Sequence, residues 1–414
     1  MKQHETYPLI PIARGDGVWL YDADGKRYLD TVSSWWVNLF GHNNPRIKDA
    51  IKLQLDTLEH VMLAGFTHEP VVELSEKLAN LTGLGHAFYG SDGASATEIA
   101  LKMSFHYWRN IGQSSKTKFI SLQNSYHGET LGALSVTDVA IFKDTYAPLL
   151  MQSAQMPSPD FRLSEAGETA EEFALRCAQS VEHYVAAHHA DLAAFIVEPL
   201  IQCAAGMGMY HPTYLRRIRE ICTQYEVHLI ADEIAVGFGR SGTMFACEQA
   251  PIKPDFTCLS KGITGGYLPL SAVLTTDKIY QAFYDNSTVR GFLHSHSYTG
   301  NPLACSAALA TLAIFETDNI LQMNQQKSAL IQAKMQVLTD LPIKHMRHQG
   351  MIFAFDVDTQ NTQFAKQCYQ AAVQQELLLR PIGNTVYWMP PYTINEEEID
   401  FMVNTTLKVI RSIL

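Results

Sequence analysis

Short apolar runs alternate with amphipathic stretches through the middle of the chain. The least interrupted runs, each bounded by Gly, Pro or acidic residues, are Lys118–Leu122, Ala193–Pro199, Val227–Glu233, Phe256–Lys261 and Leu270–Thr276. Such runs are typical of parallel strands buried on both faces. The stretches between them have a helical period, as after Pro212, where apolar residues recur at Leu215, Ile218 and Cys222. We therefore predict an α/β fold over about residues 50–300, with a mostly parallel central sheet and helices on both faces.

The two ends of the chain carry a different pattern. Val18–Tyr21 and Arg27–Asp30 flank the turn-forming pair Asp24-Gly25, which predicts two paired strands. Beyond residue 300 the pattern predicts two helices, then strands at His345–Val357 and Leu377–Met389, and a final helix from Glu396. We predict a large domain of residues 50–300 and a small, discontinuous α+β domain formed by residues 1–49 and 301–414.

Composition favours a protein with a large buried core. Of 414 residues, 47% are hydrophobic and 18% are charged, which excludes a disordered chain. The 31 basic and 42 acidic side chains give a net charge of −11. This balance argues against a nucleic-acid-binding protein, because phosphate contacts require clustered Lys and Arg. An enzyme that acts on small molecules is the favoured class.

Cysteine usage and the N-terminal segment favour the cytoplasm. The seven cysteines are widely spaced and include no C-x-x-C pair, a pattern of reduced, buried thiols rather than of a disulfide framework or a zinc site. Residues 1–10 lack a basic flank followed by an apolar run, and no apolar stretch approaches the roughly 20 residues that span a bilayer. We expect a cytoplasmic protein without a membrane partner.

Two charged residues stand at the carboxyl ends of predicted strands, where open α/β sheets bind their ligands. Asp232 follows the apolar run that begins at Val227, and Lys261 follows the run that begins at Phe256. On neighbouring strands, the two side chains could reach opposite sides of one small aromatic ring. Pyridoxal phosphate requires this pair, a lysine for its aldehyde carbon and a carboxylate for its pyridine nitrogen. We predict both residues to be catalytic, and we expect Ile234, on the same strand face as Asp232, to support the ring. An ion pair that only stabilises the strand tips is the alternative.

A phosphate site is the next requirement of this hypothesis. Tyr89–Ala96 leaves an apolar run and opens a helical stretch, so the amides of Gly93, Ala94 and Ser95 are predicted to face an anion. Tyr126 follows the strand that ends near residue 122, where an aromatic ring could stack on the cofactor. An ordinary helix N-cap and a core tyrosine explain these two features equally well.

The segment Gly237–Gly242 matches the G-x-G-x-x-G pattern of dinucleotide-binding loops. Its context is wrong for that role, because Asp232 and Glu233 occupy the strand tip and Pro251 and Pro254 interrupt the following segment. A nicotinamide-dependent oxidoreductase is therefore a remote alternative. The chain also lacks the G-x-x-x-x-G-K-[ST] motif of nucleoside triphosphate enzymes.

Histidine and tryptophan pairs complete the candidate chemistry. His294 and His296 have no neighbouring third ligand, so we predict no metal site and instead a loop near a phosphate. Trp35 and Trp36 are adjacent, and on an extended backbone their rings would point to opposite sides, so at least one ring should leave the core. The pair either lines a ligand site or anchors two lobes.

Several segments carry motifs of a known family: Ser33–Trp36, His60–Met62, Gly65–Pro70, Tyr126–Gly128, Met209–Pro212, Asp232–Arg240 and Gly300–Cys305. Through them almost the whole chain resembles the class III, or omega, aminotransferases of fold type I. Ser33–Trp36, Arg380-Pro381 and Met389–Tyr392 are most similar to the branch that acts in biotin biosynthesis. The resemblance implies a pyridoxal-phosphate-dependent transferase that forms a homodimer with shared active sites.

The resemblance also implies roles for individual cofactor residues. Lys261 would bind the cofactor aldehyde and Asp232 the pyridine nitrogen. Gly93 and Ala94 would lie in the phosphate loop. Tyr126 would lie over the ring and near the substrate, as a third catalytic residue.

Further site residues follow from the same resemblance. Trp35 and Trp36 would line the substrate tunnel. Arg380 would bind the carboxylate of the keto acid, because its planar fork matches a carboxylate. The segment before Gly300 completes the partner's phosphate pocket in this family and usually contains Gly-Pro-Thr. Here it contains Ser295, His296 and Ser297, so we predict the last two as cofactor contacts and the first as a substrate contact.

The implied reaction converts 8-amino-7-oxononanoate to 7,8-diaminononanoate, with S-adenosylmethionine as the amino donor. Lysine is the donor of some variants, and another omega-aminotransferase acting on a different amine is the alternative. Close relatives have a substrate-recognising tyrosine ahead of the first strand. Tyr7 does not match that position clearly, which leaves the donor open.

Overall fold

A seven-stranded sheet forms the centre of the larger part of the molecule. The computed structural model describes residue 5, residue 7 and residues 9–414. In spatial order the strands are β4 (His86–Gly90), β12 (Ser271–Thr275), β11 (Phe256–Leu259), β10 (His228–Asp232), β7 (Leu192–Val197), β5 (Lys118–Leu122) and β6 (Ala154–Met156). β12 is antiparallel to both neighbours, and the remaining pairs are parallel. The predicted α/β fold with a mostly parallel sheet is confirmed.

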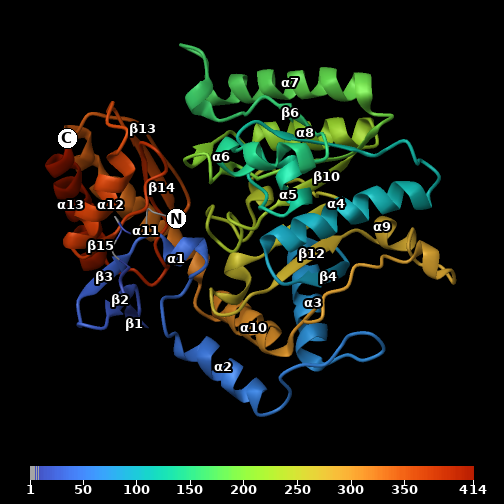
Figure 1. Ribbon diagram of the computed structural model, residues 1–414, viewed down its shortest axis with the longest axis horizontal. Helices are drawn as coiled ribbons and strands as arrows, with labels where there is room; N and C mark the ends of the chain where they lie inside the picture. Colours follow the sequence, from blue (N-terminus) through green and yellow to red (C-terminus); the bar gives the residue numbers. More distant parts are fainter. Residues whose placement is uncertain (1–4, 6, 8) are drawn as a thin grey trace.

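Helices cover both faces of this sheet, as Figure 1 shows. α4 (Gly93–Asn110) packs on one face and shares a core cluster with Ile196 of β7. α7 (Ala170–His188) and α8 (Thr213–Gln224) cover the other face, where Phe195 joins their cluster. Because residues of β7 enter the cores on both faces of the sheet, the strand has no polar position, which is the pattern that identified it.

The N-terminal strands pair with the C-terminal part of the chain. β1 (Ile12–Asp16), β2 (Trp19–Asp22) and β3 (Arg27–Asp30) form one sheet with β15 (Leu377–Leu378), and β13 (Ile343–Gln349), β14 (Ile352–Val357) and β16 (Thr385–Trp388) form another. α11 (Ile320–Lys334), α12 (Phe364–Gln374) and α13 (Glu396–Ile413) lie beside them, at the left of Figure 1. This pairing places both chain ends in one small lobe, whereas the domain limits at residues 49 and 301 stay a prediction.

Some predicted boundaries differ from the structure. His345–Val357 is a hairpin, β13 and β14, because the backbone turns at Gly350 (φ +58°). The predicted strand Phe256–Lys261 ends at Leu259, and Lys261 begins the 3-10 helix η5 (Lys261–Thr264). The remaining helices and strands are α1 (Ser33–Trp36), α2 (Pro45–Leu55), α3 (Glu69–Thr82), α5 (Leu131–Val136), α6 (Ala140–Lys143), η2 (Asp144–Leu149), η3 (Phe161–Leu163), β8 (Ile201–Gln202), β9 (Gly208–Met209), η4 (Ala246–Gln249), α9 (Asp277–Gln281), η6 (Thr288–Arg290), α10 (Pro302–Thr317) and η7 (Met335–Asp340).

The loop Gly237–Gly242 packs between the two lobes. Its Arg240 is 1% exposed and donates hydrogen bonds to the carbonyl oxygens of Asn38 (2.8 Å) and Pro390 (2.9 Å). A Cβ on Gly350 would lie 2.5 Å from the carbonyl oxygen of Arg240, so only glycine fits there. The G-x-G-x-x-G pattern therefore accompanies close packing between lobes, and the loop opens no long helix that could bind a pyrophosphate.

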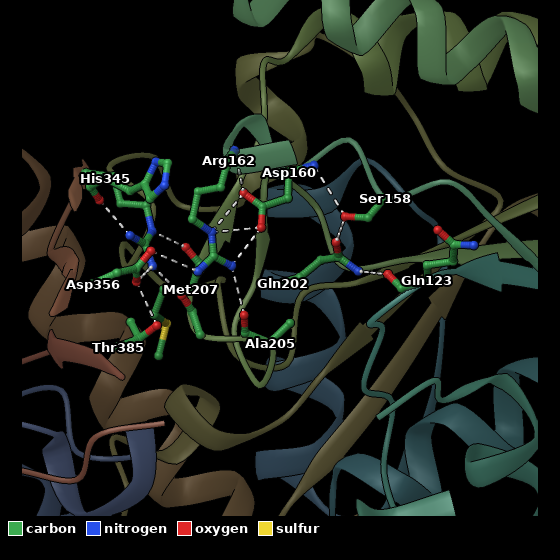
Figure 2. Close-up of polar contacts among 12 residues, drawn as sticks. Gln123, Ser158, Asp160, Arg162, Gln202, Ala205, Met207, His345, Asp356 and Thr385 are labelled. Atoms are coloured by element: carbon green, nitrogen blue, oxygen red, sulfur yellow. Dashed lines mark hydrogen bonds and ion pairs between the residues drawn. The ribbon is translucent and has the colours of Figure 1, made fainter. Parts of the chain in front are cut away.

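A polar cluster joins the lobes at a second place, shown in Figure 2. Arg347 on β13 donates from Nε to the carbonyl oxygen of Met207 (2.9 Å) and pairs with Asp356 on β14 (3.0 Å). Arg162 pairs with Asp160 (2.6 Å) and lies 3.5 Å from Asp356. Because these contacts link β13 and β14 to loops of the large lobe, they fix one lobe against the other.

No single helix in the described part of the chain is long and apolar enough to cross a membrane. α10 and the segment Ile320–Asp340 satisfy that criterion together, by length and composition only, and they are bent by 73° at the break between them. α10 packs against α2, α3 and η5.

Candidate active site

A cavity of about 490 Å³ lies at the carboxyl ends of β5, β7 and β10. Segments that follow these strands line it, together with the start of α4, the end of α1 and the start of η5. Of the residues predicted from the sequence, it contains Trp36, Gly93, Ala94, Tyr126, Asp232, Ile234 and Lys261. Distant segments of the chain thus bring an amine, a carboxylate and aromatic rings to one place.

Asp232 is the last residue of β10, and its carboxylate is held from two sides. Oδ2 lies 2.6 Å from Nδ1 of His127, and Oδ1 accepts a hydrogen bond from the backbone N–H of Ile234 (3.1 Å). The Asp232 and His127 side chains are 4% and 0% exposed. This buried pair orients the carboxylate, and it shows that His127, which the sequence did not single out, belongs to the site.

Lys261 lies two residues after the end of β11, the strand that neighbours β10 with its Asp232. β10 pairs with β11 in parallel, with Asp232 opposite Cys258, and Lys261 follows β11 with a left-handed backbone (φ +47°). Its Nζ lies 4.9 Å from the centroid of the Trp36 ring. Burial lowers the pKa of the Lys261 ammonium, and the nearby Asp232 opposes part of this shift. The amine is therefore easier to deprotonate than a surface lysine.

The lining fits pyridoxal phosphate. Lys261 and Asp232 supply the amine and the carboxylate that this cofactor requires, and Nε2 of His127 is buried without a partner in the described structure. A Cβ on Gly93 would lie 3.1 Å from Cγ2 of Ile234, so glycine keeps the start of α4 close to that side chain.

The phosphate loop differs in one detail from the prediction. Asp92 caps α4, and its side chain accepts a hydrogen bond from the Ser95 amide (2.8 Å). The sequence predicted that the Ser95 amide faces an anion. In the structure this amide already donates to Asp92 and is not free for that role. Gly93 and Ala94 line the cavity in the first turn of α4, where amides lack partners within the helix.

Tyr126 lies in the cavity between two acidic residues. Its backbone N–H donates to Oε2 of Glu198 (3.0 Å), and its hydroxyl donates to Oε1 of Glu129 (2.9 Å). Its ring packs edge-on against Phe142, with centroids 5.4 Å apart. Burial and the hydrogen bond to Glu129 raise the pKa of Tyr126, so its phenol stays protonated and can donate a hydrogen bond.

Glu198 is a functional candidate that the sequence reasoning missed. It directly follows β7, and Asp232 is the last residue of β10, so an acidic residue at the end of an apolar run was the available pattern. Glu198 lines the cavity and accepts hydrogen bonds from the backbone N–H groups of Tyr126 and Cys203 (3.2 Å). Burial raises the pKa of its carboxyl to about 7.

The raised pKa of Glu198 predicts how stability depends on pH. Above its ordinary pKa of 4.5 and up to about 7, the folded protein keeps a proton that the unfolded chain has lost. The stability contributed by this group is therefore present at low pH and is lost as pH rises through 7. We expect cofactor-free Glu198→Gln to be more stable than wild type above pH 7, by at most about 3 kcal/mol, and similar to it at pH 5. Denaturant unfolding at both pH values measures this, and the same pH dependence in both proteins would contradict it.

The tryptophan pair lies on a tight left-handed turn rather than on extended chain. α1, which holds Ser33, Ser34, Trp35 and Trp36, has φ angles of 49°, 46°, 71° and 72° in that order. This backbone costs about 1–2 kcal/mol per residue for side chains other than glycine. Trp36 is buried at the cavity and donates from Nε1 to the Tyr387 hydroxyl (3.1 Å), whereas Trp35 is 62% exposed.

The structure keeps some predicted residues out of this cavity. Arg380 is exposed, and its guanidinium carbon lies 5.1 Å from the centroid of the Trp35 ring. Nε2 of His296 lies 3.2 Å from Nε2 of His294. In the part of the chain that the structure describes, no group of three His, Cys, Asp or Glu could hold a metal ion. Ser295, His296 and Ser297, like Trp35 and Arg380, are absent from the lining that this one chain provides.

Comparison with known proteins relates almost the whole chain to pyridoxal-phosphate-dependent aminotransferases. The family model for aminotransferase class III matches residues 1–410. The adenosylmethionine-8-amino-7-oxononanoate aminotransferase of Helicobacter pylori is 46% identical over 420 residues, which cover 99% of this chain and 94% of the relative. The crystal structure of the protein of the same name from Methanocaldococcus jannaschii has a TM-score of 0.93 and 35% identity, covering 99% of this chain and 95% of that one. An amine transaminase from an uncultivated Pseudomonas species, in its PLP-bound form, has a TM-score of 0.92 and 31% identity, covering 99% and 96%.

Proposed function

We propose, from the premise that the chain belongs to the class-III aminotransferases, that it transfers an amino group from S-adenosylmethionine to 8-amino-7-oxononanoate in biotin biosynthesis. The names of its relatives supply the two substrates. The observation that carries the assignment is the turn of Trp35 and Trp36, which places one ring beside Lys261 and the other beside Arg380. An acceptor with a carboxylate at a distance from its ketone fits this arrangement.

Pyridoxal phosphate is the cofactor of this family, and when bound it supplies a ring that accepts electrons as the C–H bond beside the amine breaks. We assign Lys261 to binding the aldehyde carbon and to moving the proton, since its lowered pKa favours the free base. Asp232, oriented by His127, keeps the proton on the pyridine nitrogen. Gly93 and Ala94 bind the phosphate through their amides, Ile234 and Tyr126 hold the ring, and the Tyr126 hydroxyl also meets the substrate.

Arg380 binds the carboxylate of the keto acid in this proposal. Its guanidinium carbon lies 5.1 Å and 5.5 Å from the centroids of the Trp35 and Tyr369 rings, and among the described residues no carboxylate pairs with it. The fork is therefore free to bind a substrate carboxylate through two parallel hydrogen bonds.

Replacing Arg380 with Ala should raise the Michaelis constant for 8-amino-7-oxononanoate about 10- to 100-fold, because a charge-assisted contact is lost. Steady-state kinetics with varied keto acid measures this change. Arg380→Lys is the matched control, which retains the charge but not the fork and should lie between wild type and Arg380→Ala. An unchanged Michaelis constant in both variants would remove Arg380 from the site.

A second cavity, of about 440 Å³, adjoins Arg380 and is lined by Tyr7 and Tyr369. The two tyrosine rings have centroids 5.4 Å apart. A tyrosine from ahead of the first strand thus stands beside the proposed carboxylate site. We assign Tyr7 to substrate recognition on this ground, although the sequence alone did not identify it.

The visible spectrum of the cofactor-loaded protein tests donor and reaction together. We expect S-adenosylmethionine to bleach the yellow colour and subsequent 8-amino-7-oxononanoate to restore it, with 7,8-diaminononanoate detected by mass spectrometry. Bleaching by lysine instead would change the donor and keep the reaction. Bleaching by neither compound, with turnover of another amine, would overturn the proposed function.

The assembly and the compartment are further parts of the proposal. We propose a homodimer in which Ser295, His296 and Ser297 of one chain complete the site of the other, Ser295 at the substrate and the other two at the phosphate. Exposed apolar side chains flank this segment, with Leu293 79% and Tyr298 67% exposed, which supports its burial by a second copy. The seven cysteines are all free and buried, which supports a location in the cytoplasm. We propose no membrane partner and, with a net charge of −11, no nucleic-acid partner.

A further inference from the structure

We propose that Asp30 is the positioning residue that holds the left-handed turn of α1, and that it thereby sets Trp36 beside Lys261 and Trp35 beside Arg380. The inference deepens the proposed function and rests on it, since it concerns the pocket that selects the acceptor. Strained backbone persists only where surrounding groups hold it in place, and such strain clusters at binding sites. The turn of α1 therefore requires a group that stabilises it.

The Asp30 carboxylate contacts the turn through both of its oxygens. Oδ1 accepts hydrogen bonds from the backbone N–H groups of Ser34 (3.0 Å) and Val32 (3.3 Å). Oδ2 accepts from the Ser34 hydroxyl (2.7 Å) and lies 3.0 Å from Nε2 of His42. A carboxylate has about four acceptor positions, so these contacts use all of them. Asp30 is 0% exposed, and water does not replace these contacts in the folded protein.

The position of Asp30 explains why its effect reaches the site. It is the last residue of β3, so the strand fixes its backbone, and the turn begins within a few residues of it. The backbone N–H of Trp36 donates to the carbonyl oxygen of Val32 (2.8 Å), and the N–H of Val32 donates to Asp30. Asp30 therefore helps to fix the backbone that carries the ring beside Lys261. If the turn relaxed to an ordinary backbone, both rings would leave their present neighbours.

The left-handed turn also directs the rings of Trp35 and Trp36 to two different parts of the proposed substrate site. One ring is buried at the cofactor cavity and the next is exposed beside Arg380, so adjacent residues serve two parts of one proposed substrate site. Asp30 touches neither Lys261 nor Arg380 by any hydrogen bond or ion pair within the described residues. Its influence therefore acts through the tryptophans.

A rescue experiment tests the proposal. In Asp30→Asn the charge and one acceptor oxygen are lost at nearly constant size. We expect kcat/KM for 8-amino-7-oxononanoate to fall about 10- to 100-fold, mainly through KM, and the near-ultraviolet circular dichroism of the tryptophans to change. Ser34→Gly removes the backbone strain at an exposed position with φ +46°, because glycine adopts this angle freely. The double variant with Asp30→Asn and Ser34→Gly should have a kcat/KM at least about fivefold higher than that of Asp30→Asn alone.

Asp22→Asn is the matched control, because Asp22 lies in the same sheet and accepts hydrogen bonds from Tyr28 and Lys26 without contacting α1. It should keep wild-type kinetics and dichroism. Wild-type kinetics and dichroism in Asp30→Asn would overturn the proposal, as would a loss that Ser34→Gly does not reduce. If the wild type does not use 8-amino-7-oxononanoate, the proposed function is wrong. The role of Asp30 is still tested in that case, because Asp30→Asn should change the near-ultraviolet circular dichroism and Ser34→Gly should reverse that change.

Discussion

Replacing Lys261 with Ala should leave a colourless protein whose aminotransferase activity is at least about 10⁴-fold below wild type. The amine is the only lysine side chain in the lining of the described cavity, and the variant loses both the covalent attachment of the cofactor and the group that moves the proton. The fold should survive, because removal of an amine whose pKa is lowered by burial relieves a desolvation cost.

The visible spectrum and single-turnover rates of Lys261→Ala measure this loss. Lys278→Ala, at an exposed position on α9, is the matched control and should remain yellow and active. Retained yellow colour with normal turnover in Lys261→Ala would refute the assignment of the catalytic lysine. Unfolding of the variant, by contrast, would be visible as a loss of far-ultraviolet circular dichroism.

Replacing Asp232 with Asn should reduce kcat at least about 10³-fold while the protein still binds its cofactor. The amide keeps the size of the carboxylate but lacks the negative charge that holds a proton on the pyridine nitrogen. Without this proton the ring accepts electrons poorly. The loss should appear in kcat rather than in KM, because the substrate contacts a different side of the site.

Glu233 provides the control for Asp232, since the two carboxylates are adjacent and both are buried. Glu233 accepts hydrogen bonds from the backbone N–H groups of Ala246 (2.9 Å) and Cys247 (2.8 Å) and is absent from the lining of the cavity. Glu233→Gln should therefore alter stability and leave kcat within about threefold of wild type. A kcat for Asp232→Asn in that same range would contradict the proposed role.

Much of the large lobe was predictable because its strands are buried on both faces. Nearly unbroken apolar runs identified β5, β7, β10, β11 and β12, and the charged residues at the carboxyl ends of two runs identified the pair in the cavity. Parallel pairing of β10 and β11 follows from the α/β pattern, so the approach of Asp232 and Lys261 required little more than the order of strands. The hairpin at Gly350 was missed because a single glycine between the mostly polar segment 345–349 and the apolar segment 351–355 gave too weak a turn pattern.

The rest of the site depends on contacts that no local pattern contains. Serine and tryptophan have no preference for left-handed backbone, so the turn of α1 could not be predicted from Ser33–Trp36. It is stabilised by Asp30 and by partners more than 350 positions away, since Ser33 donates to the Met389 carbonyl oxygen and Trp36 to Tyr387. Glu198 could have been found by the reasoning that found Asp232.

The pairing of β3 with β15 has a consequence for synthesis of the chain. Leu29 and its partner Leu377 are separated by nearly the whole polypeptide. At about 5–20 residues per second, roughly 20–70 s pass on the ribosome between the two strands. Throughout that time β3 presents an unpaired edge and an uncovered apolar face, the features that promote association between chains. The nascent polypeptide is therefore most vulnerable to aggregation at its first strands, long after they have left the ribosome.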